Sequence, residues 1–306
     1  MVSGSDPGEG AGSGSGPPSG PDDSDEDGAR VSGAPAAKVE HLAADPGADP
    51  DDEDPRSASI SGPIQGTELR DAMIAFLLAC AGVAALAGLG ALVPAVDRNL
   101  GALVAVVFLY VPVYFAWRRG EDLVSYGFRA TPVRRGLAFG LGAPLILFPL
   151  FAAAFALFYE VVCRPGQSAF LHQLAMPGLC ASWKGWRAVH APGLDLGFLK
   201  LAFVQVVVIA LPEELFFRGF IHEMCERALP PRRRLLGGGI GLALLLSSAL
   251  FAAGHLAAAL DPRRLSVFFP GLLFGWMRSA TGSILAGTIA HAASNLFIRV
   301  LEQMFF

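Results

Sequence analysis

The sequence lacks the charge of a typical soluble domain. Only 16% of its 306 residues are Asp, Glu, Lys or Arg, whereas 53% are hydrophobic. The mean hydropathy is positive. In an average soluble domain, about a quarter of all residues are charged. This composition excludes an ordinary soluble domain and indicates a membrane protein.

Several functional patterns are also missing. No basic stretch followed by an apolar core lies near Met1, so no signal peptide is predicted. Glu226 stands where a zinc-protease helix beginning at His222 needs its second histidine. The glycines of residues 237–241 follow no predicted strand, which excludes a phosphate loop and favours close helix packing. The arginines lie at predicted helix ends, so nothing indicates nucleic-acid binding.

The beginning of the chain differs from the rest in charge. Residues 1–68 contain fifteen acidic and three basic residues, a balance of −12 that leaves +8 for the remainder of a chain with net charge −4. Large apolar side chains are scarce there, so the segment cannot bury enough surface to offset its ordering entropy. We predict a disordered acidic tail over residues 1–70 that acts as a solvated spacer.

From Asp71 onward, apolar segments long enough to cross about 30 Å of hydrocarbon follow one another. Only helices and closed barrels span membranes, and these segments are too long for strands. We predict an all-α, polytopic membrane bundle of about seven (six to eight) transmembrane helices. The expected spans are 72–96, 99–117, 136–159, 198–226, 237–260, 265–280 and 283–304.

Arginines in two loops predict the orientation of the bundle, because cytoplasmic loops are enriched in basic residues. They are Arg118, Arg119, Arg129, Arg134 and Arg135 in the first loop, and Arg227, Arg232, Arg233 and Arg234 in the second. The N-terminus is then cytoplasmic. The Ala, Gly, Arg and Pro usage suggests a bacterium, hence the inner (plasma) membrane. Arg263 and Arg264 lie on the nominally outer side and argue against this orientation.

The loop 160–197 is predicted to lie outside. It contains Cys163 and Cys180, which could pair as a disulfide if the compartment is oxidising. Their separation in space cannot be read from the sequence. Cys80 and Cys225 are predicted to be packing residues in helices.

Three apolar segments carry polar side chains at a spacing of four, which places each pair on one helix face. They are Glu213-Glu214-x-x-x-Arg218, Phe251-x-x-x-His255 and His291-x-x-x-Asn295. Ionisable groups cost several kcal/mol at bilayer depth and usually face a protein interior or a water-filled cavity. The spacing therefore predicts one polar site shared by three membrane helices.

Within the first segment, Glu214 and Arg218 are spaced for an intrahelical ion pair, which leaves Glu213 free for chemistry. Pro212 cannot donate to the carbonyl of Val208, so a bend is expected there. A desolvated carboxylate suits a general base that activates water, and Asn295 could donate to an oxyanion.

Each pair also has a structural interpretation. In it, the two glutamates and Arg218 form a structural ion network. His255 is then a core histidine with a satisfied ring, and the pair His291 and Asn295 holds helices together by hydrogen bonds. Three coincident structural explanations are less economical than one site.

The three motifs, in this order, resemble those of the CPBP family, which includes CAAX prenyl endopeptidases and bacteriocin-processing or immunity-type membrane proteins. The resemblance covers roughly residues 198–304, so it divides the chain into the tail, the helices and outer loop of residues 71–197, and a catalytic membrane domain over 198–306. It implies an intramembrane endopeptidase in which Glu213 is the base, His255 assists, and His291 and Asn295 complete the site.

The motifs leave the mechanism and the substrate open. Glu213, His255 and His291 would suit zinc with an open position, yet the same groups can run a metal-free attack by water. A membrane-anchored protein or peptide processed in a bacterium is the expected substrate. The alternative from another class is a non-enzymatic binding, immunity or transport protein that uses the same cavity; no clear pair of broken repeats supports a transporter.

Overall fold

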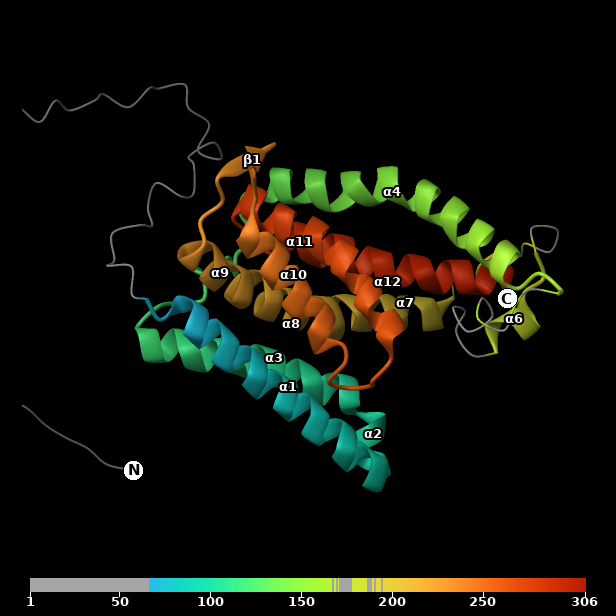
Figure 1. Ribbon diagram of the computed structural model, residues 1–306, viewed down its shortest axis with the longest axis horizontal. Coiled ribbons are helices and arrows are strands. Elements are labelled where there is room, and N and C mark those ends of the chain that lie inside the picture. The colour runs from blue at the N-terminus through green and yellow to red at the C-terminus, as the bar shows by residue number, and fades with distance from the viewer. Residues whose placement is uncertain are drawn as a thin grey trace, which may run out of the picture. The chain divides into compact units, whose positions relative to one another are not determined.

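The computed structural model describes residues 66–166, 168, 170, 178–185, 189, 191–193 and 195–306. The predicted tail lies outside this part except for its last few residues, where Glu68 already begins the first helix. The prediction of an all-α bundle is confirmed, since most of the described chain is helical (Figure 1). The N-terminal helices are α1 (Glu68–Leu92), α2 (Pro94–Arg98), α3 (Leu100–Arg119) and α4 (Val133–Val162).

The C-terminal helices follow the short α6 (Leu179–Ser182). A continuous helix over residues Leu196–Ala228 comes first, then α10 (Leu242–Gly254), α11 (Phe268–Thr281) and α12 (Leu285–Phe305). In the described part, α1, α3, α4 and the helix Leu196–Ala228 are long and apolar enough to cross a membrane. Helices α10 and α11 have 13 and 14 residues and are shorter than a usual span.

The helix Leu196–Ala228 is not a regular α-helix. It contains α7 (Leu196–Val204), the π-helical η2 (Gln205–Ala210), α8 (Leu211–Glu214), the π-helical η3 (Leu215–Ile221) and α9 (His222–Ala228). Pro212, which lacks an amide hydrogen, stands between the two π-helical turns. Such turns occur mostly as short interruptions of α-helices, frequently at functional sites. Here they flank the two glutamates.

The predicted helix over 237–260 is wrong at both ends. Residues Arg233–Leu235 (β1) and Gly238–Ile240 (β2) form an antiparallel hairpin. Its turn has positive φ angles at Leu236 (49°) and Gly237 (86°), as hairpin turns of two residues require. After α10 the chain turns through residues 255–261 into a 3₁₀ helix, η4 (Pro262–Val267).

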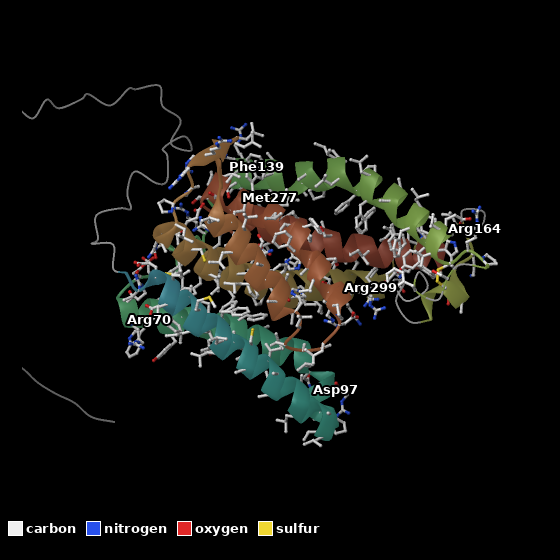
Figure 2. The ribbon with its side chains drawn as sticks, viewed as in Figure 1. Arg70, Asp97, Phe139, Arg164, Met277 and Arg299 are labelled. Atoms are coloured by element: carbon white, nitrogen blue, oxygen red, sulfur yellow. A yellow bond between two sulfur atoms is a disulfide. The ribbon has the colours of Figure 1, made fainter. Side chains whose placement is uncertain are left out.

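An aromatic core joins α1 and α3 to the helix that carries the glutamates. The rings of Phe108 and Phe216 stack with their centroids 5.1 Å apart. Phe217 meets Phe251 of α10 edge to face at 5.1 Å. Between α4 and α11, the labelled side chains of Phe139 and Met277 belong to a second apolar cluster (Figure 2). These contacts fix the spacing of the helices around the polar residues.

A chain of ion pairs links four helices and one loop at the arginine-rich end of the bundle. It runs from α1 through α3 and the loop after it to α9 and α11, over Asp71, Arg119, Glu121, Arg227, Glu223 and Arg278. The N···O distances lie between 2.6 and 3.1 Å. Because the pairs share partners, they act as a network and hold the ends of these helices together.

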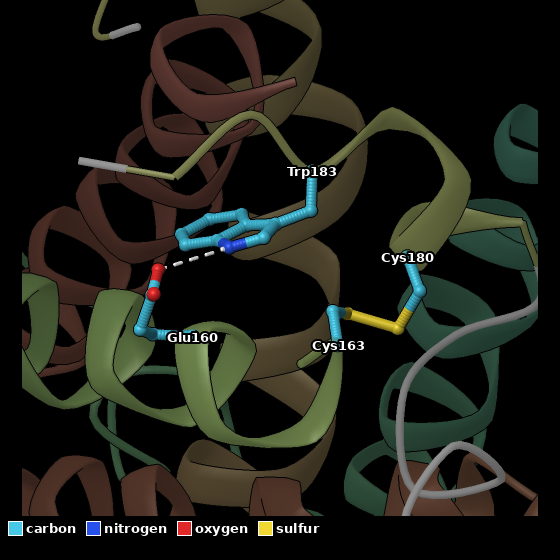
Figure 3. The surroundings of a disulfide bond; sticks show 4 residues. All are labelled: Glu160, Cys163, Cys180 and Trp183. Atoms are coloured by element: carbon cyan, nitrogen blue, oxygen red, sulfur yellow. Dashed lines mark hydrogen bonds between the residues drawn. A yellow bond between two sulfur atoms is a disulfide. The ribbon is translucent and has the colours of Figure 1, made fainter. Parts of the chain in front are cut away.

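Cys163, directly after α4, is disulfide-bonded to Cys180 of α6 (Figure 3). Beside the bond, Trp183 donates through Nε1 to Glu160 at 3.3 Å. The Trp183 ring also stacks on Phe305 near the end of α12. The loop after α4 is thereby tied to the end of the bundle opposite the hairpin (Figure 1).

Candidate active site

The ion pair predicted from spacing is present in the interior of the bundle. Nη1 of Arg218 lies 3.1 Å from Oε1 of Glu214, and both side chains are almost completely buried. The same carboxylate oxygen accepts a hydrogen bond of 2.9 Å from Nδ1 of His291 on α12. One buried carboxylate therefore binds a cation from its own helix and an imidazole from another, which compensates its desolvation.

Glu213 lies on the other side of His291. Its Oε2 is 3.8 Å from Nε2 of His291, too far for a direct hydrogen bond and within reach through one water. Glu213 is partly exposed, at 17% of its side chain, whereas Glu214 is at 0%. Its Oε2 accepts no hydrogen bond from the described residues. Glu214 is thus held by Arg218 and His291, and Glu213 is the more exposed of the two carboxylates.

Phe251 and Phe274 both contact the guanidinium of Arg218 and the imidazole of His291. The Arg218 guanidinium carbon lies 3.7 Å from the ring centre of Phe251 and 5.2 Å from that of Phe274. The His291 ring stacks on Phe274 at 5.2 Å with an angle of 19°, and meets Phe251 edge to face at 6.0 Å. Aromatic faces attract cations, so these rings favour the charged guanidinium and restrict the imidazole.

His255 caps the end of α10. Its Nδ1 donates to the backbone carbonyl of Phe251 at 2.9 Å, because a carbonyl can only accept. In the neutral ring, Nε2 is then the basic nitrogen. The ring lies 4.7 Å from that of Phe251, so Phe251 contacts both histidines of the site.

Asn295 lies one helical turn beyond His291 on α12. Its Nδ2 donates a hydrogen bond of 2.9 Å to Oε1 of Gln205, a buried residue on the π-helical turn η2. This bond uses one of the two amide hydrogens of Asn295. The second hydrogen can serve another acceptor.

Gly287 allows α12 to approach the buried carboxylate. A Cβ atom at this position would lie 2.5 Å from Oε2 of Glu214, closer than real Cβ contacts allow. The short distance between Glu214 and His291 therefore depends on a residue without a side chain, one turn before the histidine.

The three candidate metal ligands are not gathered into a ligand set. The described residues contain no group of three His, Cys, Asp or Glu side chains placed to hold a metal ion. His291 directs Nδ1 to Glu214, and His255 directs Nδ1 to a carbonyl, which leaves Nε2 of each ring for another partner. The chemistry below uses the side chains alone.

His222, the first residue of the discarded zinc pattern, lies in a separate polar cluster. It is fully buried, with Nδ1 at 2.8 Å from Oγ of Ser247 and Nε2 at 3.6 Å from Glu226. Glu226 also accepts from Ser279 of α11 at 2.6 Å. These contacts join α9 to α10 and α11 and give the histidine a structural role.

The structure thus brings Glu213, Glu214, Arg218 and His291 together and adds Phe251 between the two histidines. It also shows three residues that motif spacing did not reveal: Gln205, Phe274 and Gly287. Only Gln205 gave a signal, as an amide inside an apolar run.

The comparison with known families agrees with this arrangement. Residues 195–297, about a third of the chain, match the family model of the Rce1-like type II CAAX prenyl endopeptidases. The resemblance to the CPBP family is confirmed. The matched part contains all three motifs of the family and the helix Leu196–Ala228. With its apolar helices, the chain is an integral membrane protein, and the match supports a CAAX-type intramembrane peptidase. No curated protein and no solved structure matches the chain.

Proposed function

We propose that the protein is an endopeptidase that hydrolyses a peptide bond of a membrane-anchored protein or peptide by means of water activated at Glu213. The observation that carries this proposal is the placement of His291 between two carboxylates that differ in burial. Glu214 fixes the ring, and Oε2 of Glu213 is buried without a hydrogen-bond partner among the described residues.

In the proposed reaction, Glu213 accepts a proton from a water molecule as the oxygen attacks the scissile carbonyl carbon. The proton on the carboxyl is then available to the leaving amine, so the same group acts first as base and then as acid. Water adds across the bond, and one amine and one carboxylic acid are released. No further reactant is needed.

The other polar residues are proposed to stabilise the carbonyl oxygen, to order the water and to assist the proton transfer. The second amide hydrogen of Asn295 is suited to donate to the carbonyl oxygen as it becomes negative. The imidazole of His291 orders the water beside Glu213 through Nε2. His255 presents a basic nitrogen from the end of α10 and assists the proton transfer.

The substrate is proposed to be an anchored polypeptide of a bacterial membrane, with the arginine-rich loops and the N-terminus on the cytoplasmic side. The acidic N-terminal segment is proposed to be a spacer that takes no part in the reaction. The helices before residue 198 then form a supporting domain, and residues 198–306 form the catalytic one.

The test compares cells that carry the wild-type chain, Glu213→Gln or the control Glu302→Gln. Glutamine preserves the shape of glutamate but cannot take the proton. We expect precursors of membrane-anchored proteins to accumulate in the Glu213→Gln cells alone, as read by mass spectrometry of protein termini in isolated membranes. Unchanged termini, with the variant present at wild-type levels, would favour the non-enzymatic alternative.

A further inference from the structure

An apolar groove lies beneath the β1–β2 hairpin, outside the candidate active site. Its volume is about 570 Å³, within the range of about 300–1,000 Å³ that ligand pockets occupy. Residues of the hairpin, α10 and α11 line it, among them Leu235, Ile240, Leu244, Leu245, Leu272 and Trp276. None of the catalytic candidates contributes to this lining.

The groove lining suits a hydrocarbon chain better than a peptide. The indole Nε1 of Trp276 already donates to the carbonyl of Leu235 at 2.9 Å. The other lining residues have apolar side chains or none. A peptide would leave its own backbone groups unpaired against these surfaces, which costs several kcal/mol per group in a lipid environment.

The strand register places a cation at the edge of the groove. Arg233 pairs with Ile240 across the hairpin and stands two residues before Leu235. Side chains of a strand alternate between faces, and cross-strand partners share a face. The side chain of Arg233 therefore leaves the hairpin on the face of Leu235 and Ile240, which line the groove.

Other arginines surround this edge. Arg232 precedes β1, and Arg135 in the first turn of α4 donates to the carbonyl of Leu236 at 3.3 Å. Arg232 and Arg233 are exposed. Whereas Arg227 and Arg278 are bound by carboxylates, no ion pair with a described carboxylate holds Arg232 or Arg233. An apolar groove that ends at unpaired guanidinium groups matches an amphiphile with a negative head.

We propose that this groove binds an anionic phospholipid, with one acyl chain along α10 and α11 and its phosphate beside Arg233 and Arg232. Guanidinium groups bind phosphate through two parallel hydrogen bonds, and Arg is suited to this contact. The lipid would tie the hairpin to α11, the helix that carries Phe274.

The experiment uses the full chain, purified in an uncharged maltoside detergent, and follows thermal unfolding by tryptophan fluorescence. Phosphatidylglycerol and phosphatidylcholine with identical acyl chains are titrated in parallel. We expect phosphatidylglycerol to raise Tm at concentrations where phosphatidylcholine has little effect. Arg233→Gln should weaken its apparent affinity about fivefold, the effect of one arginine near an anionic lipid surface. Arg118→Gln, which removes the same charge from α3, should leave it unchanged.

Further measurements separate the contribution of the apolar groove from that of the arginines. Leu245→Trp fills the groove without removing a charge and should also weaken lipid binding, whereas Leu147→Trp on α4 should not. Inorganic phosphate and glycerol phosphate should give no shift at matched concentrations. Arg233→Lys should restore part of the affinity and shows that the site still folds. Glu213→Gln should bind the lipid like the wild type, because this proposal does not depend on catalysis.

Equal shifts of Tm with both lipids would overturn the proposal, because they would show a general effect of lipid. An unchanged affinity for phosphatidylglycerol in Arg233→Gln would also overturn it. A shift of the same size with inorganic phosphate would mean that the arginines bind an anion without using the groove, which would also contradict it.

Discussion

His291 is held by Glu214, although 77 positions separate the two residues in the sequence: Nδ1 of the imidazole lies 2.9 Å from Oε1 of the buried carboxylate. The same oxygen lies 3.1 Å from the Arg218 guanidinium. This contact joins the first and third motifs, and it distinguishes Glu214, which holds the imidazole, from the more exposed Glu213.

Replacing Glu214 should destabilise the protein as well as inactivate it. Glu214→Ala strands the buried guanidinium of Arg218, and removing one partner of a buried pair costs about 3–5 kcal/mol. Glu302→Ala is the control, because its pair with Arg299 at 2.8 Å lies at the surface and such pairs contribute about 1 kcal/mol or less. Unfolding in detergent measures the loss of stability in both variants. Equal loss in the two variants would contradict the assignment of Glu214.

Gln205 is predicted to act through Asn295. Gln205→Met keeps the length of the side chain and removes the acceptor for Nδ2, so the amide of Asn295 can rotate. We expect kcat to fall about tenfold or more, the usual size for a supporting partner, with little change in KM. Gln205→Glu should recover activity, since a carboxylate accepts the same hydrogen bond.

A double variant provides the stricter test of this pair. If Gln205 acts only by orienting Asn295, adding Gln205→Met to Asn295→Ala should cause no further loss of kcat. A full additional loss would mean that Gln205 supports the site by another route, such as packing of the π-helical turn η2.

Gly287→Ala tests the close approach of α12. The new methyl group would lie 2.5 Å from Oε2 of Glu214, so the carboxylate or the helix must move and the contact with His291 must lengthen. We expect loss of both activity and thermal stability. Gly142→Ala on α4 is the matched control, because a Cβ there meets nothing within 4 Å, and alanine is the better helix former by about 1 kcal/mol.

The stability of the fold should depend on pH through Glu121. This carboxylate accepts hydrogen bonds from Arg119 (2.8 Å) and Arg227 (2.6 Å). Burial raises the pKa of this carboxyl, but the two guanidinium groups outweigh it and hold the pKa below its ordinary value of 4.5. A group with a lowered pKa stabilises the fold above its unfolded pKa, and this contribution is lost as the pH falls through the folded value.

Wild type and Glu121→Gln are therefore compared by thermal unfolding from neutral pH downward. The variant should be less stable at neutral pH, and the difference in Tm should narrow below about pH 4.5 as Glu121 of the wild type becomes protonated. A difference that stays constant across this range would show that the ion pairs of Glu121 do not contribute to the acid sensitivity.

Spacing along the helices predicted much of the site. The period of the helix placed Glu214 with Arg218, and the cost of charge in lipid indicated that His291 belongs with them. Gly287 and Phe274 could not be found in this way, because their contacts arise from the packing of separate helices. The π-helical turns could not be predicted either, because they depart from the α-helical period on which the prediction is based.

The hairpin was missed because the glycines of residues 237–241 were interpreted as a helix-packing surface. Gly238 and Gly239 do lie against neighbours, with Trp276 and Pro231 within 2.4 and 2.6 Å of their would-be Cβ atoms. Close packing was thus predicted correctly, but in strands. The positive φ of Leu236, which makes the turn, is unusual for a leucine and has no signature in the sequence.

The disulfide between Cys163 and Cys180 can be used to measure the orientation of the chain in the membrane. It lies after α4, whose first turn carries Arg134 and Arg135, and the 30 residues of the helix separate the two ends by about 45 Å. Thiols on the cytoplasmic side stay reduced, whereas those on the opposite side are oxidised. A maleimide gel-shift assay on whole membranes would therefore report the fraction of molecules inserted with the arginines inside, without any fusion partner.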